Sequence, residues 1–145
     1  MKVNEAIVLD LIVAVEERDI DRVLDLYDPN VKFLWPPSLP GYGGTYRGPE
    51  VFDMNRAFAA AWDPVQLSDE ARRIHPRVIA SNDVEVVVHY HQRGTDANGR
   101  SCDSEVLGLY QVENGKVTRL QMFYFDPEQV ARFLEESDTT QSTKP

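Results

Sequence analysis

The hydrophobic and polar positions follow a helical spacing in the first half of the chain. Apolar residues recur at this spacing in residues 5–17, and again after Asp19, a residue type suited to cap the start of a helix. A third helical stretch covers residues 49–62, where Pro49 suits the first turn. The first half therefore predicts three helices, with a short strand at residues 31–35 between the second and the third.

The second half alternates with the period of two that is typical of β-strands. The segments between the strands read SND, TDANG and ENG, and Asn-Gly is a strong signal for a hairpin turn. We therefore predict an antiparallel meander, with strands at residues 65–80, 84–94, 101–112 and 117–125.

A last helix follows the meander. Asp126 suits its N-cap, Pro127 its first position and Gln129 the partner in a capping box. Helices grouped beside an antiparallel sheet define the α+β class, and we predict a curved, cone-shaped sheet wrapped around the N-terminal helices. Residues 1–136 would form this single domain, and residues 137–145 a disordered polar tail. The apolar interior of the cone is where a ligand would bind.

Residues 36–48 separate the first strand from the third helix. This segment is rich in proline and glycine, and it is long for a connection in a compact domain. Loops of this kind often cover binding sites, so we predict a loop that lies at the mouth of the interior.

Charge and cysteine content narrow the possible partners and the compartment. The 145 residues carry a net charge of −9 without any basic run, which argues against nucleic acid and membrane surfaces as partners. Cys102 is the single cysteine, so no intrachain disulfide is possible, as expected in a reducing cytoplasm. No signal peptide is evident, and no run approaches the roughly 20 apolar residues of a spanning helix. We predict a cytoplasmic location.

Three stretches of the chain resemble the nuclear transport factor 2-like superfamily. They are RDIDRVLDLYDPNVKF (18–33), YRGPEVF (46–52) and the segment from VENGKV to YFD (112–126). The superfamily includes SnoaL-like polyketide cyclases, ketosteroid isomerases, scytalone dehydratases and limonene epoxide hydrolases. The resemblance covers residues 5–136 and implies a cystatin-like α+β barrel. It is weaker for function, because the superfamily also contains non-catalytic binding and assembly modules.

The nearest local resemblance is to the limonene epoxide hydrolases, in VKFLWPPSLPGYG, SNDVEVVVHYHQ and LGLYQVENGK. The catalytic residues of that family do not carry over. Phe33 and Trp35 occupy the positions of its water-positioning Tyr and Asn. Its Arg-x-Asp pair falls on His89 and His91, and its water-activating Asp falls on Met122. The resemblance therefore does not imply epoxide hydrolysis here.

The cyclase and isomerase branches give the same result. The pocket Asp of the SnoaL-like cyclases also falls on Met122, and their His falls on Gly108. The ketosteroid isomerase base falls on Trp35. None of these chemistries transfers residue by residue.

His89 and His91 are the main candidates for catalysis, although two arguments about their orientation conflict. The resemblance implies that both face the pocket. The alternation of Val86, Val88 and Tyr90 as a buried face would instead place both histidines outside. If they face inward, burial would favour neutral imidazoles, which could act as general base and acid. If they face outward, they are sheet-surface or dimer-interface residues.

The other candidates lie around the predicted pocket. Tyr124 could donate a hydrogen bond to a substrate, and Asp126 could orient it, although its capping position already gives Asp126 a structural role. We therefore predict four catalytic residues: His89, His91, Tyr124 and Asp126. The predicted substrate-binding residues are Phe33, Trp35, Tyr42, Phe58, Trp62, Val106, Gly108 and Met122.

We predict neither a cofactor nor a metal site. A tight turn at residues 82–83 would pair His75 with Tyr90, on the face away from the other two histidines.

The leading hypothesis is a cofactor-independent acid–base enzyme, of the isomerase, cyclase, dehydratase or hydrolase type. It would form a homodimer and act on a hydrophobic small molecule. The alternative is a non-catalytic ligand-binding, dimerisation or assembly module of the same fold.

Overall fold

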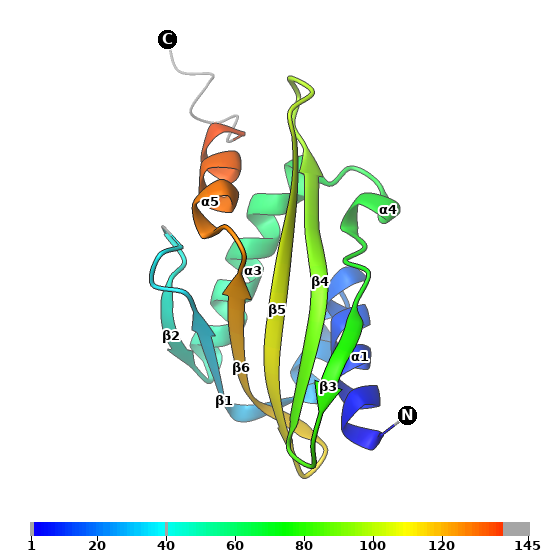
Figure 1. The fold of residues 1–145 in the computed structure, drawn as a ribbon. Helices are drawn as coiled ribbons and strands as arrows, with labels where there is room; N and C mark the ends of the chain where they lie inside the picture. Colours follow the sequence, from blue (N-terminus) through cyan, green and yellow to red (C-terminus); the bar gives the residue numbers. More distant parts are fainter. Residues whose placement is uncertain (1, 40, 138–145) are drawn as a thin grey trace.

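A computed structural model describes residues 2–39 and 41–137 (Figure 1). The polar tail predicted for residues 137–145 lies outside this range apart from its first residue. The helices are α1 (Val3–Glu16), α2 (Ile20–Leu26), α3 (Pro49–Trp62), α4 (Asp69–Arg72) and α5 (Pro127–Glu136). Two predicted caps are confirmed, because Asp19 accepts a hydrogen bond from the Arg22 amide and Asp126 accepts one from the Gln129 amide.

Six strands form one curved, unclosed sheet in the order β2-β1-β6-β5-β4-β3. The strands are β1 (Tyr27–Trp35), β2 (Gly44–Arg47), β3 (Arg77–Ser81), β4 (Glu85–Thr95), β5 (Ser101–Glu113) and β6 (Lys116–Tyr124). The meander β3-β4-β5-β6 is antiparallel, as predicted. The predicted antiparallel sheet needs one correction, because β1 runs parallel to β6.

The turn between β5 and β6 shows how the sequence fixes the register of the meander. Asn114 and Gly115 have φ angles of 53° and 76°, the left-handed values of a two-residue type I′ turn. These two residue types tolerate such values, and Glu113 therefore pairs directly with Lys116.

Two connections differ from the sequence prediction. Residues 36–48 contain β2, because the loop turns back through hydrogen bonds from the Leu39 amide to Pro36 and from the Gly43 amide to Leu39. The strand predicted from residue 65 begins only at Arg77. Before it lie a 3₁₀ turn and α4, which Ser68 caps by accepting a hydrogen bond from the Ala71 amide at 3.1 Å. In both places a local turn determines the conformation.

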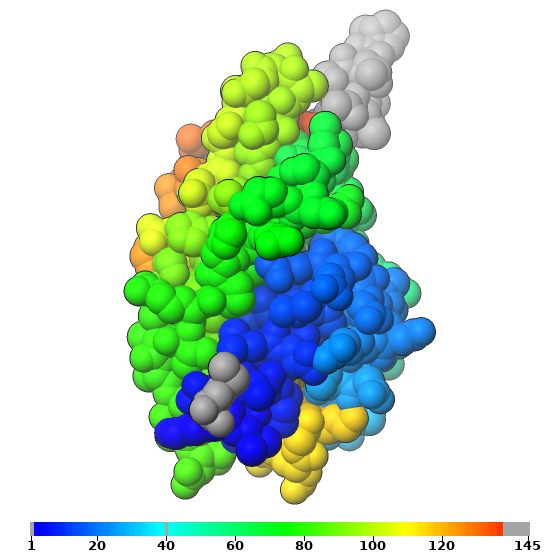
Figure 2. Space-filling model, turned by 90° about the vertical axis from the view of Figure 1, so that its right-hand side faces the viewer, coloured from blue at the N-terminus to red at the C-terminus, as the bar shows by residue number. Residues whose placement is uncertain are grey.

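The helices cover one face of the sheet, which we call the inner face. α1 contacts β4, β5 and β6, α2 contacts β1 and β6, and α3 contacts β1 and β2. In Figure 2 the N-terminal helices (blue) lie directly against the green segment that holds α4 and β3. Alternate residues of β4 and β5 are buried toward these helices, so the core lies between the two layers. Within the described ranges, no helix is both long and apolar enough to cross a bilayer.

Candidate functional site

A cavity of about 360 Å³ lies between the inner face of the sheet and the helices α1, α2 and α3. Its wall is largely aromatic. The ring centroids of Phe33 and Trp35 are 4.6 Å apart, and those of Trp35 and Phe58 are 5.2 Å apart. Trp62 and Met122 extend the same apolar surface. The wall therefore suits a flat, hydrophobic molecule.

Four buried tyrosines bring hydroxyl groups to this cavity. Tyr27 accepts a hydrogen bond from the Asn55 amide at 3.2 Å, and Tyr90 donates one to the Met122 sulfur at 3.2 Å. Burial raises the pKa of Tyr27 to about 12. It also raises the pKa values of Tyr90, Tyr110 and Tyr124 above the ordinary value. All four hydroxyls are therefore protonated at neutral pH and can donate hydrogen bonds.

Among the described lining residues, five buried polar atoms have no hydrogen-bond partner. Two are the Nε atoms of Arg18 and Arg72, and the three from uncharged side chains are the hydroxyl of Tyr124, the Oε1 atom of Gln92 and the Nε1 atom of Trp62. Gln92 lies near enough to Tyr124 to offset part of the burial effect on its pKa, but no hydrogen bond with acceptable geometry joins them. An unpaired buried polar atom costs about 1–3 kcal/mol, so these atoms favour a ligand that pairs with them.

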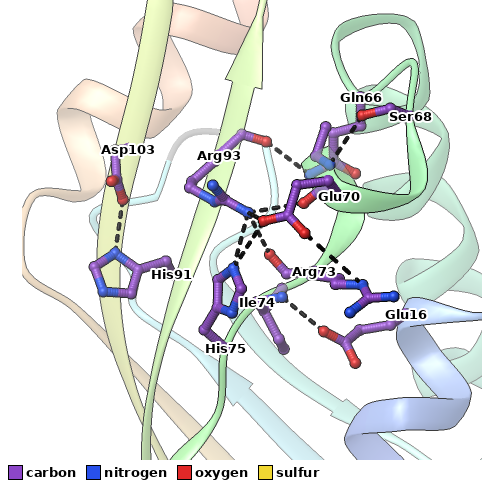
Figure 3. Close-up of polar contacts among 11 residues, drawn as sticks. Glu16, Gln66, Ser68, Glu70, Arg73, Ile74, His75, His91, Arg93 and Asp103 are labelled. Atoms are coloured by element: carbon purple, nitrogen blue, oxygen red, sulfur yellow. Dashed lines mark hydrogen bonds and ion pairs between the residues drawn. The ribbon is translucent and has the colours of Figure 1, made fainter.

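Charged residues line the rim of the cavity and connect the elements around it. Arg18 forms an ion pair with Asp63 at 2.8 Å, which links the end of α1 to the end of α3. Glu16 accepts a hydrogen bond from the Ile74 amide at 2.7 Å, as Figure 3 shows. The described lining residues include no histidine. Their two carboxylates already have partners, because Glu16 binds the Ile74 amide and Asp63 binds Arg18. The interior thus offers hydrogen-bond donors and acceptors, but no deep acid–base pair.

The structure places His89 and His91 on the other face of the sheet, which we call the outer face. β4 pairs with β5 without a bulge, so Val88 and Tyr90 point inward and the two histidines point outward. His89 contacts Glu105 at 3.1 Å, and His91 contacts Asp103 at 2.7 Å. The inward orientation implied by the resemblance is therefore wrong, and the proton-transfer roles predicted for these histidines in the pocket lack a geometric basis.

The remaining predicted residues divide into two groups. Phe33, Trp35, Phe58, Trp62, Met122 and Tyr124 line the cavity. The others lie elsewhere. Tyr42 packs behind the wall with its ring 4.8 Å from that of Phe58, Asp126 caps α5, and Val106 and Gly108 are on the inner face but outside the lining.

Sequence reasoning missed several polar residues of the lining. Tyr90 and Gln92 share the parity of Val86 and Val88 in β4, so the alternation already placed them inside. Tyr27, Asn55 and Tyr110 also line the cavity, but no local pattern brings them together.

Residues 8–120 match the family of SnoaL-like domains, and the chain belongs to this family. The family includes polyketide cyclases and isomerases, and it has the nuclear transport factor 2-like fold. No curated protein matches the chain by sequence.

Several solved structures share the fold. TerC, which was co-crystallised with polyporic acid, superimposes with a TM-score of 0.77 at 20% identity, over 92% of this chain and 99% of that chain. An NTF2-like protein of unknown function from Burkholderia pseudomallei is 26% identical, with a TM-score of 0.69 over 92% of this chain and 98% of that chain. A protein of unknown function from Xanthomonas campestris, with a cystatin-like fold, is 23% identical. Its TM-score is 0.74, over 92% of this chain and 98% of that chain.

Proposed function

We propose that this protein binds a hydrophobic, oxygen-bearing small molecule in the cavity between its helices and its sheet. The observation that carries the proposal is the set of unpartnered polar atoms of Tyr124, Gln92 and Trp62 in an otherwise apolar, aromatic wall. Apolar pockets with a few convergent polar groups are typical of small-molecule sites, because the apolar wall supplies affinity and the polar groups supply orientation.

The polar atoms define the chemistry of this ligand. The Tyr124 hydroxyl and the Trp62 indole N–H donate hydrogen bonds, so they match a carbonyl or another acceptor oxygen. Oε1 of Gln92 accepts, so it matches a hydroxyl group. An aromatic ketone or a hydroxylated ring compound satisfies both requirements. TerC, which has the same fold, was crystallised with polyporic acid, and this supports a ligand of comparable character.

An enzymatic role on the same ligand is the second candidate. Tyr124 is held protonated by burial, so it can donate a hydrogen bond to a carbonyl oxygen on which negative charge develops. Stabilisation of that kind suits a cofactor-independent isomerisation or cyclisation. This enzymatic role uses other residues than the mechanism predicted from the sequence. Tyr124 acts on the substrate, and His89 and His91 take no part.

Substitution of Tyr124 by phenylalanine tests both roles. We expect affinity for an aromatic ketone to fall about fivefold, because one hydrogen bond of about 1 kcal/mol is lost. Affinity for the matched hydrocarbon should not change. The free energy of unfolding should stay level or rise slightly, because an unpaired buried hydroxyl is removed. Ligand titrations followed by tryptophan fluorescence, together with urea unfolding, measure these quantities.

Tyr27→Phe is the matched control, because the Tyr27 hydroxyl already has a partner in Asn55. This variant should lose about 1 kcal/mol of stability and keep its preference for the ketone. The proposal is contradicted if Tyr124→Phe weakens ketone and hydrocarbon equally. Turnover of a ketone substrate that disappears in Tyr124→Phe while binding persists would favour the enzyme over the binding protein.

We further propose that a second copy of the chain covers the outer face of the sheet. Phe123 and Phe125 are 45% and 59% exposed on this side, and Leu107 and Leu109 are only half-buried there. The face is also self-complementary in charge. At one end of this face β5 carries Asp103 and Glu105. Near the other end, Lys32 of β1 and Arg119 of β6 lie side by side on neighbouring strands. A twofold axis would bring the acidic end of one copy to the basic end of the other.

Introduction of a charge at the centre of this face should separate the two copies. We expect Leu109→Lys to convert a dimer into a monomer, measured by light scattering coupled to size-exclusion chromatography. Leu67→Lys is the control, because Leu67 is 84% exposed and lies outside the sheet. A wild-type chain that is monomeric at all concentrations would contradict the dimer.

A further inference from the structure

The outer face holds a cluster of metal-binding side chains that the cavity does not use. His89 and His91 are two residues apart on β4, and Glu105 lies directly across from His91 on β5. Each of the three residues offers one ligand atom, and these atoms lie within 4.8 Å of one another. We propose that His89, His91 and Glu105 bind a divalent first-row transition metal ion, with Zn²⁺ as the reference case.

Part of the coordination geometry is already present. Ligand atoms at about 2.0–2.1 Å from a tetrahedral zinc ion lie about 3.3 Å from each other. Nε2 of His89 and Oε1 of Glu105 are 3.1 Å apart, close to that separation. The third ligand is His91, whose ligand atom lies within 4.8 Å of the other two. A rotation of its partly exposed side chain can bring this atom to the metal. The ion would take the place of the direct contact between Nε2 of His89 and Oε1 of Glu105.

Asp103 provides an independent indication. Its carboxylate accepts a hydrogen bond from Nδ1 of His91 at 2.7 Å, which leaves Nε2 of His91 available to a metal. A carboxylate on the second ring nitrogen is the usual support of a metal-bound histidine, because it fixes the tautomer and the ring orientation. The prediction of no metal site from the sequence rested on a set of three histidines and on the absence of the usual ligand spacings. The set in the structure contains two histidines and a carboxylate.

The surrounding charges favour a cation at this place. Arg93 is the residue across from Asp103, and it could have neutralised the cluster. Its guanidinium instead turns toward the α4 segment, where it donates hydrogen bonds to the carbonyl oxygens of Glu70 and Arg73, as Figure 3 shows. Within one chain, the ion-pair contacts of Asp103 and Glu105 among the described residues are therefore the two imidazoles, and no lysine or arginine pairs with either carboxylate. Two imidazoles with one carboxylate form a donor set that zinc uses where it keeps one position open.

The test is Zn²⁺ binding by the full chain, measured in competition with a chromophoric chelator. We expect one ion per chain, and more than about tenfold weaker binding in His91→Gln and in Glu105→Gln. Asp103→Asn should weaken binding by about 10–100-fold, because it removes the support of a ligand without removing a ligand. His75→Gln is the matched control, because His75 lies outside the cluster beside Glu70 and Arg93.

The outcomes separate this proposal from those about the cavity and the dimer. Leu109→Lys should still bind one ion, because all three ligands come from one chain. Ketone binding in the cavity should be the same in His91→Gln as in the unaltered chain. The metal site is overturned if no stoichiometric binding occurs, or if His75→Gln weakens binding as much as His91→Gln. Circular dichroism of each variant shows whether a loss of binding reflects a loss of fold.

Discussion

A rise in pH from about 10 to about 12 is expected to unfold this protein steeply, because buried tyrosines resist ionisation. Tyrosine in an unfolded chain ionises near pH 10, whereas the pKa of Tyr27 in the fold is about 12. The pKa values of Tyr90, Tyr110 and Tyr124 are also raised by burial. Between these values only the unfolded chain releases protons, so the free energy of unfolding falls as the pH rises.

The size of the effect follows from the number of buried tyrosines. Each one lowers the free energy of unfolding by about 1.4 kcal/mol for each pH unit between its unfolded and folded pKa values. Below pH 10 the four hydroxyls are protonated in both states, and their contribution is constant. Urea unfolding at a series of pH values gives the slope, and phenolate absorbance shows when the tyrosines ionise.

Tyr124→Phe isolates the contribution of one tyrosine from that of lysine and arginine titration. This variant should lose stability less steeply above pH 10 than the unaltered chain, by about 1.4 kcal/mol per pH unit. Phenolate absorbance should appear together with unfolding. Phenolate that forms well before the fold is lost would mean that these hydroxyls are open to solvent, and it would contradict the burial of the four tyrosines.

Substitution of Gly108 by valine is expected to lower the free energy of unfolding by about 1–3 kcal/mol. A Cβ atom at Gly108 would lie 2.7 Å from Cε1 of Tyr110 and 3.4 Å from its hydroxyl oxygen. The Tyr110 ring would have to move, and Tyr110 lines the cavity. The variant should therefore also bind aromatic ligands more weakly. Urea unfolding and ligand titration measure the two effects.

A double-mutant cycle with Tyr110→Leu checks this cause. The smaller leucine removes the overlap, so Gly108→Val should cost much less in that background than in the unaltered chain. An equal cost in both backgrounds would show that the glycine is needed for its backbone, and that contact with Tyr110 is not the reason. Gly108 was predicted to touch substrate, but this geometry gives it a supporting role behind a residue that does line the cavity.

The histidines of β4 show how the two kinds of sequence evidence differ. The alternation of Val86, Val88 and Tyr90 placed His89 and His91 outside, and this was correct because the β4–β5 ladder has no bulge to change the parity. The resemblance placed them inside, and this was wrong. An alignment that rests on similar segments can be displaced by one residue. In a strand, a displacement of one residue assigns every side chain to the opposite face of the sheet.

Patterns in the sequence were enough to predict the class of the fold, the helix at Pro49–Trp62, the cap at Asp126 and the hairpin at Asn114 and Gly115. These features depend on hydrophobic periodicity and on residue types that act within a few positions, so the chain carries them locally. Three features became visible in the folded chain alone: the parallel pairing of β1 with β6, the cavity, and the cluster of His89, His91 and Glu105 on the outer face. These features arise where packing brings distant segments together, and no local pattern records which segments meet.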